Sequence, residues 1–486
     1  MAAESAIRAT NPLLPAPSAR AGLQLSELLG ALSHALDLTE GQPEGHCVRA
    51  CWIGTAIGRE RGLSEPDLWE LYYTLLLKDL GCSSNAARIC QLYLTDDLTF
   101  KRDFKTVGDS APQLLRFVAG HTGPAAGLIE RFRTLLSVVQ RSGQIANEVI
   151  AARCERGAGI ARKLRFPEAV ADGIASLDEH WNGGGQPMGA KGAEIPLYSQ
   201  IALMAQVVDV FNTSAGRDAA RQELRRRSGT WFDPALVADF ERAAARPGFW
   251  ETLDSPDLET ALLALEPARH AKSLDEDYLD DIASGFAEVV DSKSPYTSGH
   301  SSRVAEVTCL IAAELGFTAP RRRWLRRAAL LHDIGKLGVS NLILDKPGKL
   351  TDTEWVAMRD HAAIGERILS RIAAFDELAV IAGAHHEKLD GTGYPRKLRG
   401  AQIALETRVI TAADIFDALT AKRPYRDALS VDQALAVMQA EIGTAIDAEC
   451  FAALGKALAK QREAAKPARP PRPRRNRDVD TAWWGG

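Results

Sequence analysis

Apolar residues recur along most of the chain with the three- and four-residue spacing of amphipathic helices. Tyr278, Ile282 and Phe286, for example, fall on one face of a helix that ends before Pro295. No stretch of alternating apolar and polar residues longer than four positions indicates a strand. The pattern therefore predicts an all-α fold.

Breaks in this pattern divide the chain into two helical regions and three other segments. We expect helical domains over residues 23–250 and 274–460, separated by a connector at 251–273 with two prolines and one short helix. An Ala/Pro-rich start (1–22) and a basic, proline-rich tail (461–486) are predicted to be disordered.

Composition narrows the class of protein. The chain has 486 residues, 46% of them apolar and 25% charged, which is typical of a soluble globular protein. Its net charge of −4 argues against a nucleic-acid-binding surface, and no apolar run approaches the roughly 18–20 residues of a membrane span. The start of the chain lacks the pattern of a secretory signal. Seven scattered cysteines indicate reduced thiols rather than a disulfide framework, so we expect a cytoplasmic location.

Candidate chemistry is concentrated in the second helical region. His332 and Asp333 end an apolar helix just before Gly335, which we expect to stop that helix. An adjacent imidazole and carboxylate suit a divalent metal, although alone such a pair would more often be a histidine satisfied at a helix end. Four further histidines lie on the inward face or at the end of a predicted helix: His300, His361, His385 and His386. Five separately buried imidazoles would be costly without partners, so convergence on metal ions is the favoured interpretation.

The loop after the last histidine pair contains Gly391, Gly393, Tyr394 and Pro395, whose backbone can approach a ligand closely. Residues 275–460 resemble the HD-GYP family of the HD phosphohydrolase superfamily. The resemblance rests on five motifs in order: HSSRV at 300–304, HDIGK at 332–336, His361, HHEKLDGTGYP at 385–395 and AADIFDALTAKRPYR at 412–426.

The resemblance implies an all-helical domain with a centre of divalent metals, most often iron or manganese. One metal would be held by His300, His332, Asp333 and Asp414, and the second by His361, His385 and His386, with Asp333 bridging the two. Some members add a third metal through a glutamate, but Tyr296 stands at that position here, so a dinuclear site is favoured.

The implied reaction is hydrolysis of cyclic di-GMP to pGpG, and often further to GMP. Two cations sharing a water would lower its pKa and supply hydroxide, with Asp333 and Lys336 as catalytic residues and Lys336 neutralising a phosphate oxygen. Gly393, Tyr394 and Pro395 are predicted to contact substrate. Arg423 and Arg426 are predicted to clamp its second phosphate, although a solvated basic helix end explains these two arginines equally well.

The first helical region repeats the second in degenerate form. His46 precedes Asp79 by 33 residues, as His300 precedes Asp333, and EHWNGGGQP at 179–187 parallels HHEKLDGTGYP. By spacing, Lys78 replaces His332, Cys82 replaces Lys336, Glu155 replaces His361 and Glu179 replaces His385, while His46, Asp79, His180 and Asp209 remain. We expect a salt-bridge network around Lys78 and Asp79 instead of a metal, and a structural, regulatory or ligand-sensing role.

Two other functions stay open from the sequence. The enzyme could hydrolyse another cyclic dinucleotide or a nucleotide phosphate, since nothing distinguishes guanine from adenine. Alternatively, the intact site could belong to a non-catalytic module that binds a nucleotide or a protein. Beyond the cyclic dinucleotide, the expected partners are a second copy of the chain or a signalling protein.

Overall fold

The computed structural model describes residues 23–464, except 109, 125, 268–273 and 423–425. Within this part of the chain the secondary structure is helical, and β pairing is limited to isolated bridges. The predicted all-α fold is therefore confirmed. The predicted disordered start and residues 465–486 of the predicted tail lie outside the described residues. None of the described helices is both long and apolar enough to cross a bilayer.

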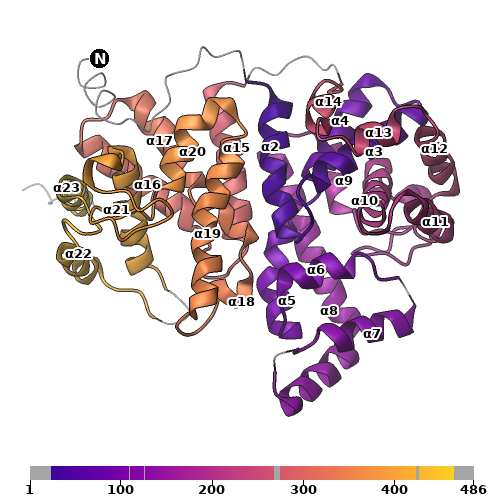
Figure 1. Cartoon of the computed structure of the whole chain (residues 1–486), viewed down its shortest axis with the longest axis horizontal. Coiled ribbons are helices and arrows are strands. Elements are labelled where there is room, and N and C mark those ends of the chain that lie inside the picture. The colour runs from indigo at the N-terminus through magenta and orange to yellow at the C-terminus, as the bar shows by residue number, and fades with distance from the viewer. Residues whose placement is uncertain (1–22, 109, 125, 268–273, 423–425, 465–486) are drawn as a thin grey trace, which may run out of the picture.

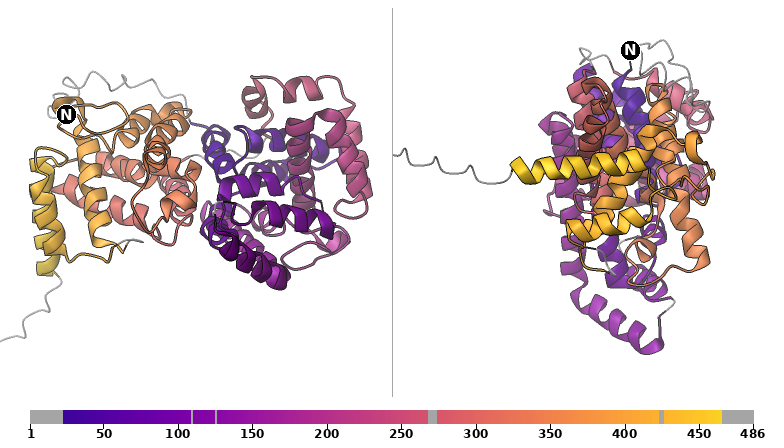
Figure 2. Two further views of the ribbon diagram at one scale, coloured as in Figure 1. Left: turned by 60° about the horizontal axis from the view of Figure 1, so that its bottom comes forward. Right: turned by 90° about the vertical axis from the view of Figure 1, so that its left-hand side faces the viewer.

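The chain forms two helical halves that lie side by side (Figures 1 and 2). The first half contains α2 (Leu25–Thr39), α3 (His46–Glu60), α4 (Glu65–Leu77), η1 (Cys82–Asn85), α5 (Ala86–Tyr93), α6 (Asp97–Phe104), α7 (Ala111–His121), α8 (Leu128–Lys163), α9 (Glu168–Ala175), η2 (Gly192–Glu194), α10 (Leu197–Ala215), α11 (Arg217–Arg227), α12 (Pro234–Ala244), α13 (Phe249–Leu253) and α14 (Leu258–Leu263). The second half contains α15 (Glu276–Asp291), α16 (His300–Glu314), α17 (Ala319–Leu331), η3 (Ile334–Gly338), α18 (Asn341–Leu344), α19 (Asp352–Leu369), η4 (Ala373–Phe375), α20 (Asp376–Gly383), η5 (Gly400–Gln402), α21 (Leu405–Thr420), α22 (Val431–Ala440) and α23 (Ala448–Ala464).

The described part of the predicted connector, residues 251–267, contains the short helix expected there, α14. It carries the end of α13 and all of α14, and α14 packs on α2 and α3 with Leu258 and Leu262 buried. Because these leucines lie one helical turn apart, they give α14 an apolar face that belongs to the core of the first half.

The two halves contact each other reciprocally. In the first half α2 packs on η3 and α19 of the second half, and α15 of the second half packs on η1 and α8 of the first. Since α2 and α15 are the opening helices of their halves, each half offers the same elements to the other. This arrangement is the intramolecular counterpart of a two-fold dimer interface.

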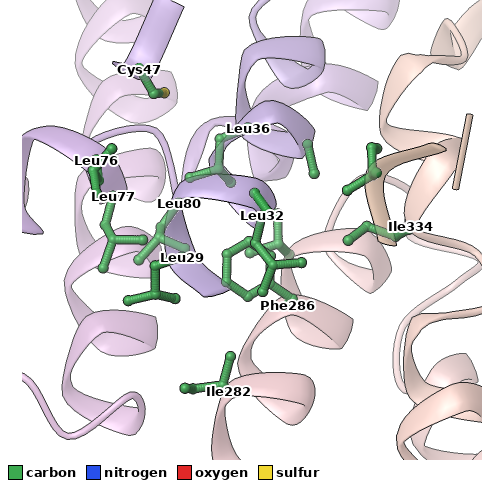
Figure 3. Packing of buried hydrophobic residues seen from close by; sticks show 14 of the residues in the cluster. Leu29, Leu32, Leu36, Cys47, Leu76, Leu77, Leu80, Ile282, Phe286 and Ile334 are labelled. Carbon is green, nitrogen blue, oxygen red and sulfur yellow. The ribbon is translucent and has the colours of Figure 1, made fainter. Parts of the chain in front are cut away.

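A single cluster of buried residues continues across this contact. It joins Leu32 of α2, Phe286 of α15 and Ile334 of η3, none of which exposes any surface (Figure 3). Burying a side chain of this kind stabilises a protein by about 1.5–3 kcal/mol. The halves therefore share one hydrophobic core. This core includes Ile334, the residue directly after Asp333.

Candidate metal centre

Five elements of the second half bring the predicted ligands together. His300 is the first residue of α16, where Gly299 adopts a left-handed φ of 70° that turns the chain into the helix. The other predicted ligands lie directly after α17 (His332 and Asp333), within α19 (His361), after α20 (His385 and His386) and within α21 (Asp414).

Asp333 lies at the centre of the group, and its two oxygens face different histidines. Oδ2 is 3.4 Å from Nε2 of His300 and 3.3 Å from Nε2 of His332. Oδ1 is 3.4 Å from Nε2 of His361 and 3.6 Å from Nε2 of His385. The carboxylate therefore lies between two sets of imidazoles, as a bridging ligand would.

The remaining two predicted ligands complete these sets. Asp414 Oδ1 is 3.5 Å from Nε2 of His300, and Asp414 also groups with His332 and His385, their ligand atoms lying within 4.8 Å of one another. His386 groups in the same way with Asp333, His361 and His385. All seven predicted ligands thus belong to one continuous cluster.

Backbone carbonyls orient three of the histidines. Nδ1 of His332, His361 and His385 lies 2.7, 2.5 and 2.5 Å from the carbonyl oxygens of Ala329, Met358 and Ala382, respectively. Because a carbonyl can only accept a hydrogen bond, Nδ1 is the protonated nitrogen. Each Nε2 is then left with its lone pair directed to the centre, which is the common arrangement of metal-binding histidines.

A carboxylate orients His300 instead, and the sequence analysis did not identify it. Asp417 Oδ2 accepts from Nδ1 of His300 at 2.7 Å, while Oδ1 accepts from Nε of Arg303 at 2.5 Å. Burial opposes ionisation of Asp417, but its bonds to His300 and Arg303 lower its pKa overall. The signal was present as a second aspartate three residues after Asp414, one helical turn along α21.

The chemistry of the donor set fits divalent metal ions. Nε2 of His300, Nε2 of His332 and Oδ1 of Asp333 are buried and have no hydrogen-bond partner among the described residues. Burial lowers the pKa of His361 to about 3 and holds that of His386 well below its usual value. These imidazoles are therefore neutral, which is the form that binds metal.

The predicted catalytic and substrate-contacting residues are placed as follows. Lys336, in η3, contacts Asp333 through its ammonium group. The ring of Tyr394 lies 4.8 Å from that of His386, so the glycine-rich loop forms a wall beside the cluster. Gly393 is buried where a Cβ would come within 2.3 Å of the Lys388 backbone nitrogen, whereas Pro395 is exposed.

Of the two predicted arginine clamps, the one that the structure describes, Arg426, uses its guanidinium away from the cluster. Arg423 lies outside the described residues. The guanidinium of Arg426 donates to the backbone carbonyls of Ala418 and Leu419, which closes the C-terminal turn of α21. Arg359, which the sequence analysis missed, is exposed two residues before His361, with its guanidinium 5.7 Å from the Tyr394 ring.

Gly335 acts differently from the prediction. Helix α17 already ends at Leu331, and Gly335 lies inside η3. A Cβ at this position would come within 2.0 Å of the carbonyl oxygen of His361 and 2.7 Å of the nitrogen of Gly365. The glycine is therefore needed because η3 touches the backbone of α19, and this contact holds Asp333 against His361.

The same close contact in the first half corrects the predicted alignment of the two halves. A Cβ at Gly81 would clash with the carbonyl of Arg153, so Arg153, and not Glu155, corresponds to His361. A Cβ at Gly185 would clash with the backbone of residues 178–180. A Cβ at Gly393 would clash in the same way with the backbone of residues 386–388. Glu179 therefore corresponds to Glu387, and both carboxylates accept backbone N–H groups of the loop that follows.

The predicted equivalence of Asp209 is wrong for the same reason. Asp209 accepts from Nδ1 of His46 at 2.6 Å and from Nε of Arg49 at 2.5 Å, which repeats the contacts of Asp417. The counterpart of Asp414 is therefore Gln206, three residues earlier. Of the seven predicted ligands, only those corresponding to His46 and Asp79 are kept in the first half.

Side-chain cations lie where the first half would hold metals. The buried ammonium of Lys78 contacts Asp79 and lies 3.0 Å from Nε2 of His46, as the predicted salt-bridge network requires. The guanidinium of Arg153 pairs with Asp178. Although burial disfavours its charged form, Asp79 raises the pKa of Lys78, so the ammonium stays protonated.

Comparisons with known proteins agree with this geometry. A family model for the HD domain matches residues 108–236 and 285–450. A relative named 3'3'-cGAMP-specific phosphodiesterase 3, from Vibrio cholerae serotype O1, is 56% identical over 434 residues, covering 89% of this chain and 94% of the relative. The chain belongs to the HD-GYP family. Membership confirms the predicted family and the prediction that the protein is an enzyme.

Two further relatives extend the comparison. The crystal structure of a cyclic GMP-AMP specific phosphodiesterase of V. cholerae, V-cGAP3, matches with a TM-score of 0.62 and 49% identity over 90% of this chain and 98% of that one. The cyclic di-GMP phosphodiesterase response regulator RpfG of Xanthomonas campestris pv. campestris is 40% identical, but over only 37% of this chain and 48% of its own length.

Proposed function

We propose that the chain is a metal-dependent phosphodiesterase that hydrolyses 3'3'-cGAMP. The single observation that supports catalysis best is the position of the Asp333 carboxylate, whose oxygens lie within 3.6 Å of four histidine Nε2 atoms. A site that only recognised a nucleotide would not need a carboxylate placed between four imidazoles.

The proposed ligands divide into two sets around Asp333. His300, His332 and Asp414 would hold one divalent cation, and His361, His385 and His386 the other. When bound, such a pair supplies an activated water and neutralises charge on the reacting phosphate. Iron or manganese is the proposed metal, because the resemblance to HD-GYP proteins implies one of these two.

Three side chains of the chain itself complete the proposed site. Lys336 stays close to the centre through Asp333 and can offer its remaining N–H groups to a phosphate oxygen. Tyr394 presents an apolar ring beside His386 on which a base can stack. Arg359, exposed near that ring, can contact the second phosphate in place of Arg426, whose donors are used within α21.

The choice of substrate rests on the extent of the similarity. The relative named for 3'3'-cGAMP is 56% identical over 89% of the chain, whereas RpfG, named for cyclic di-GMP, is 40% identical over 37% of the chain. This difference favours 3'3'-cGAMP over the cyclic di-GMP expected from the sequence alone. The end product and the order of the two cleavages are left to experiment.

Hydrolysis of a panel of substrates tests the proposal. Purified full-length protein would be analysed for metal content and incubated with 3'3'-cGAMP, cyclic di-GMP and cyclic di-AMP, with products separated by chromatography. We expect kcat/KM to be at least about tenfold higher for 3'3'-cGAMP than for the other two. Equal or better hydrolysis of cyclic di-GMP would overturn the substrate, and no hydrolysis by metal-loaded protein would favour a binding module.

A further inference from the structure

The first half keeps an open cavity at the position of its lost metal site. The cavity has a volume of about 260 Å³ and lies between α5, α6, α8 and α10. Its lining includes Arg153, Asp178 and Gln206, the counterparts of His361, His386 and Asp414. Ligand pockets usually measure roughly 300–1,000 Å³, so this cavity suits a small ligand and would not hold a cyclic dinucleotide.

One end of the cavity carries fixed positive charge. Lys101, Lys105 and Arg153 line it together with only two carboxylates, Glu40 and Asp178, so the lining has one excess cation. Lys105 lies 2.8 Å from Glu40 and 3.2 Å from Gln206, and both lysines are largely buried. Their charges are therefore weakly screened, and because Glu40 and Asp178 neutralise two of the three cations, an anionic group placed here would interact with one excess positive charge.

The same end also offers acceptors that lack donors. Oε1 of Glu40 and Oδ1 of Asn85 are buried, line the cavity and have no hydrogen-bond partner among the described residues. A buried acceptor left unpaired costs about 1–3 kcal/mol. A ligand that brings N–H or O–H groups next to its anionic group would recover this free energy.

The walls of the cavity are apolar and aromatic. Phe100 and Phe104 of α6 and Val207 and Val210 of α10 are part of the lining. Trp231 also lines the cavity, but its ring already stacks on that of His180 and lies under the Arg227 guanidinium, so the exposed ring of Phe104 is the aromatic surface offered to a ligand. Aromatic surfaces of this kind hold a flat ring by stacking, which is worth about 1–3 kcal/mol per base in nucleic-acid complexes.

We propose that this cavity is a regulatory site for a nucleoside monophosphate. A nucleotide of this size combines the three features that the lining selects: a phosphate for Lys105 and Arg153, ribose or base donors for Glu40 and Asn85, and a flat base for the aromatic wall. The site is non-catalytic, because side-chain cations replace the metals that the second half uses.

Helix α6 links the cavity to the catalytic half. Phe100 and Lys101 line the cavity, and Asp97 on the same helix accepts from the backbone nitrogen of Asn341 at 2.9 Å and pairs with Lys293. Lys293 in turn donates to the carbonyl of Leu337, the residue after Lys336. A ligand that fixes α6 therefore also fixes η3, which carries Lys336 beside Asp333.

Binding would be measured by calorimetry with full-length protein and GMP or AMP as probes, with guanosine and inorganic phosphate as partial ligands. We expect one saturable site per chain for at least one nucleotide, with guanosine and phosphate each at least about tenfold weaker, since each lacks part of the contacts. Two variants should also weaken nucleotide binding at least about tenfold. Lys105→Ala removes one of the cations that line the cavity, and Val149→Trp places a larger side chain of α8 in the cavity. Asp333→Asn, in the second half, should leave this binding unchanged.

The regulatory role has a separate readout. A saturating nucleotide should change the rate of cyclic dinucleotide hydrolysis in the wild type and not in Lys105→Ala or Val149→Trp, whose unfolding transitions would be checked to match the wild type. Binding lost in Asp333→Asn and kept in both cavity variants would place the ligand in the catalytic site and overturn the proposal. Absence of saturable nucleotide binding, or binding without any change in rate, would overturn it as well.

Discussion

Asp97 of the first half and Lys293 of the second half form a buried ion pair, with Oδ2 and Nζ 3.4 Å apart. Neither side chain exposes more than 2% of its surface. Asp97 also accepts from the backbone nitrogen of Asn341, and Lys293 donates to the carbonyl of Leu337. The pair therefore joins the first half to the segment that follows Asp333.

Replacing one partner of this pair should destabilise the whole chain. In Asp97→Asn the ammonium of Lys293 stays buried without its counter-ion, so the free energy of unfolding should fall by about 3–5 kcal/mol. The double variant Asp97→Asn/Lys293→Met should recover most of this loss, because no unpaired charge remains. Denaturant unfolding followed by circular dichroism measures the free energy of unfolding of the single and the double variants. If the effects of the two single substitutions simply added in the double variant, Asp97 and Lys293 would not be energetically coupled.

Removal of the central carboxylate should abolish metal binding and hydrolysis together. Asp333→Asn replaces the carboxylate that lies between four histidines with a neutral amide, and we expect a loss of at least about 10²–10³ in kcat with fewer metal ions per chain by elemental analysis. The matched control is Lys78→Met/Asp79→Asn, which removes the corresponding buried pair in the first half without leaving a lone charge. This control should keep its metal content; a similar loss there would mean that the first half binds the metal.

The carboxylate that orients His300 allows a comparison between the two halves. Asp417→Asn should weaken metal affinity or activity about 10–100-fold, because Nδ1 of His300 loses its anionic acceptor. Asp209→Asn makes the same change beside His46 and should leave metal affinity unaltered. Chelator titration of both variants gives the affinities, and equal losses in the two would refute the assigned roles.

The close contact between η3 and α19 predicts that adding one methyl group at Gly335 disturbs the metal-binding cluster. Gly335→Ala would place a Cβ within 2.0 Å of the His361 carbonyl, so η3 must move away from α19 and take Asp333 with it. We expect loss of metal and a lower midpoint of unfolding. Gly348→Ala, whose Cβ would meet nothing within 4 Å, is the control and should behave as the wild type. A stable, metal-loaded Gly335→Ala protein would contradict this interpretation.

The sequence predicted which polar residues of the second half come together, because each lies at a helix end or on an inward face, where periodicity is informative. It misplaced the later positions of the first half by two or three residues, since Glu179 next to His180 imitates a histidine pair by spacing alone. Only the three-dimensional contacts show that Glu179 accepts backbone N–H groups, as Glu387 does. The role of Arg426 could not be predicted either. Its guanidinium donates to backbone carbonyls, and a sequence motif does not show which carbonyls lie nearby.

The reciprocal packing of α2 and α15 has a consequence for how the enzyme behaves on dilution. Two separate chains paired through such faces would come apart as their concentration falls, whereas the halves described here are tethered within one polypeptide and keep a fixed one-to-one ratio. Each assembled pair therefore carries one cluster of histidines and aspartates around Asp333 and one cavity beside Arg153, at any abundance of the protein. The tether thus lets the two halves differ in these polar side chains while each still packs on the other.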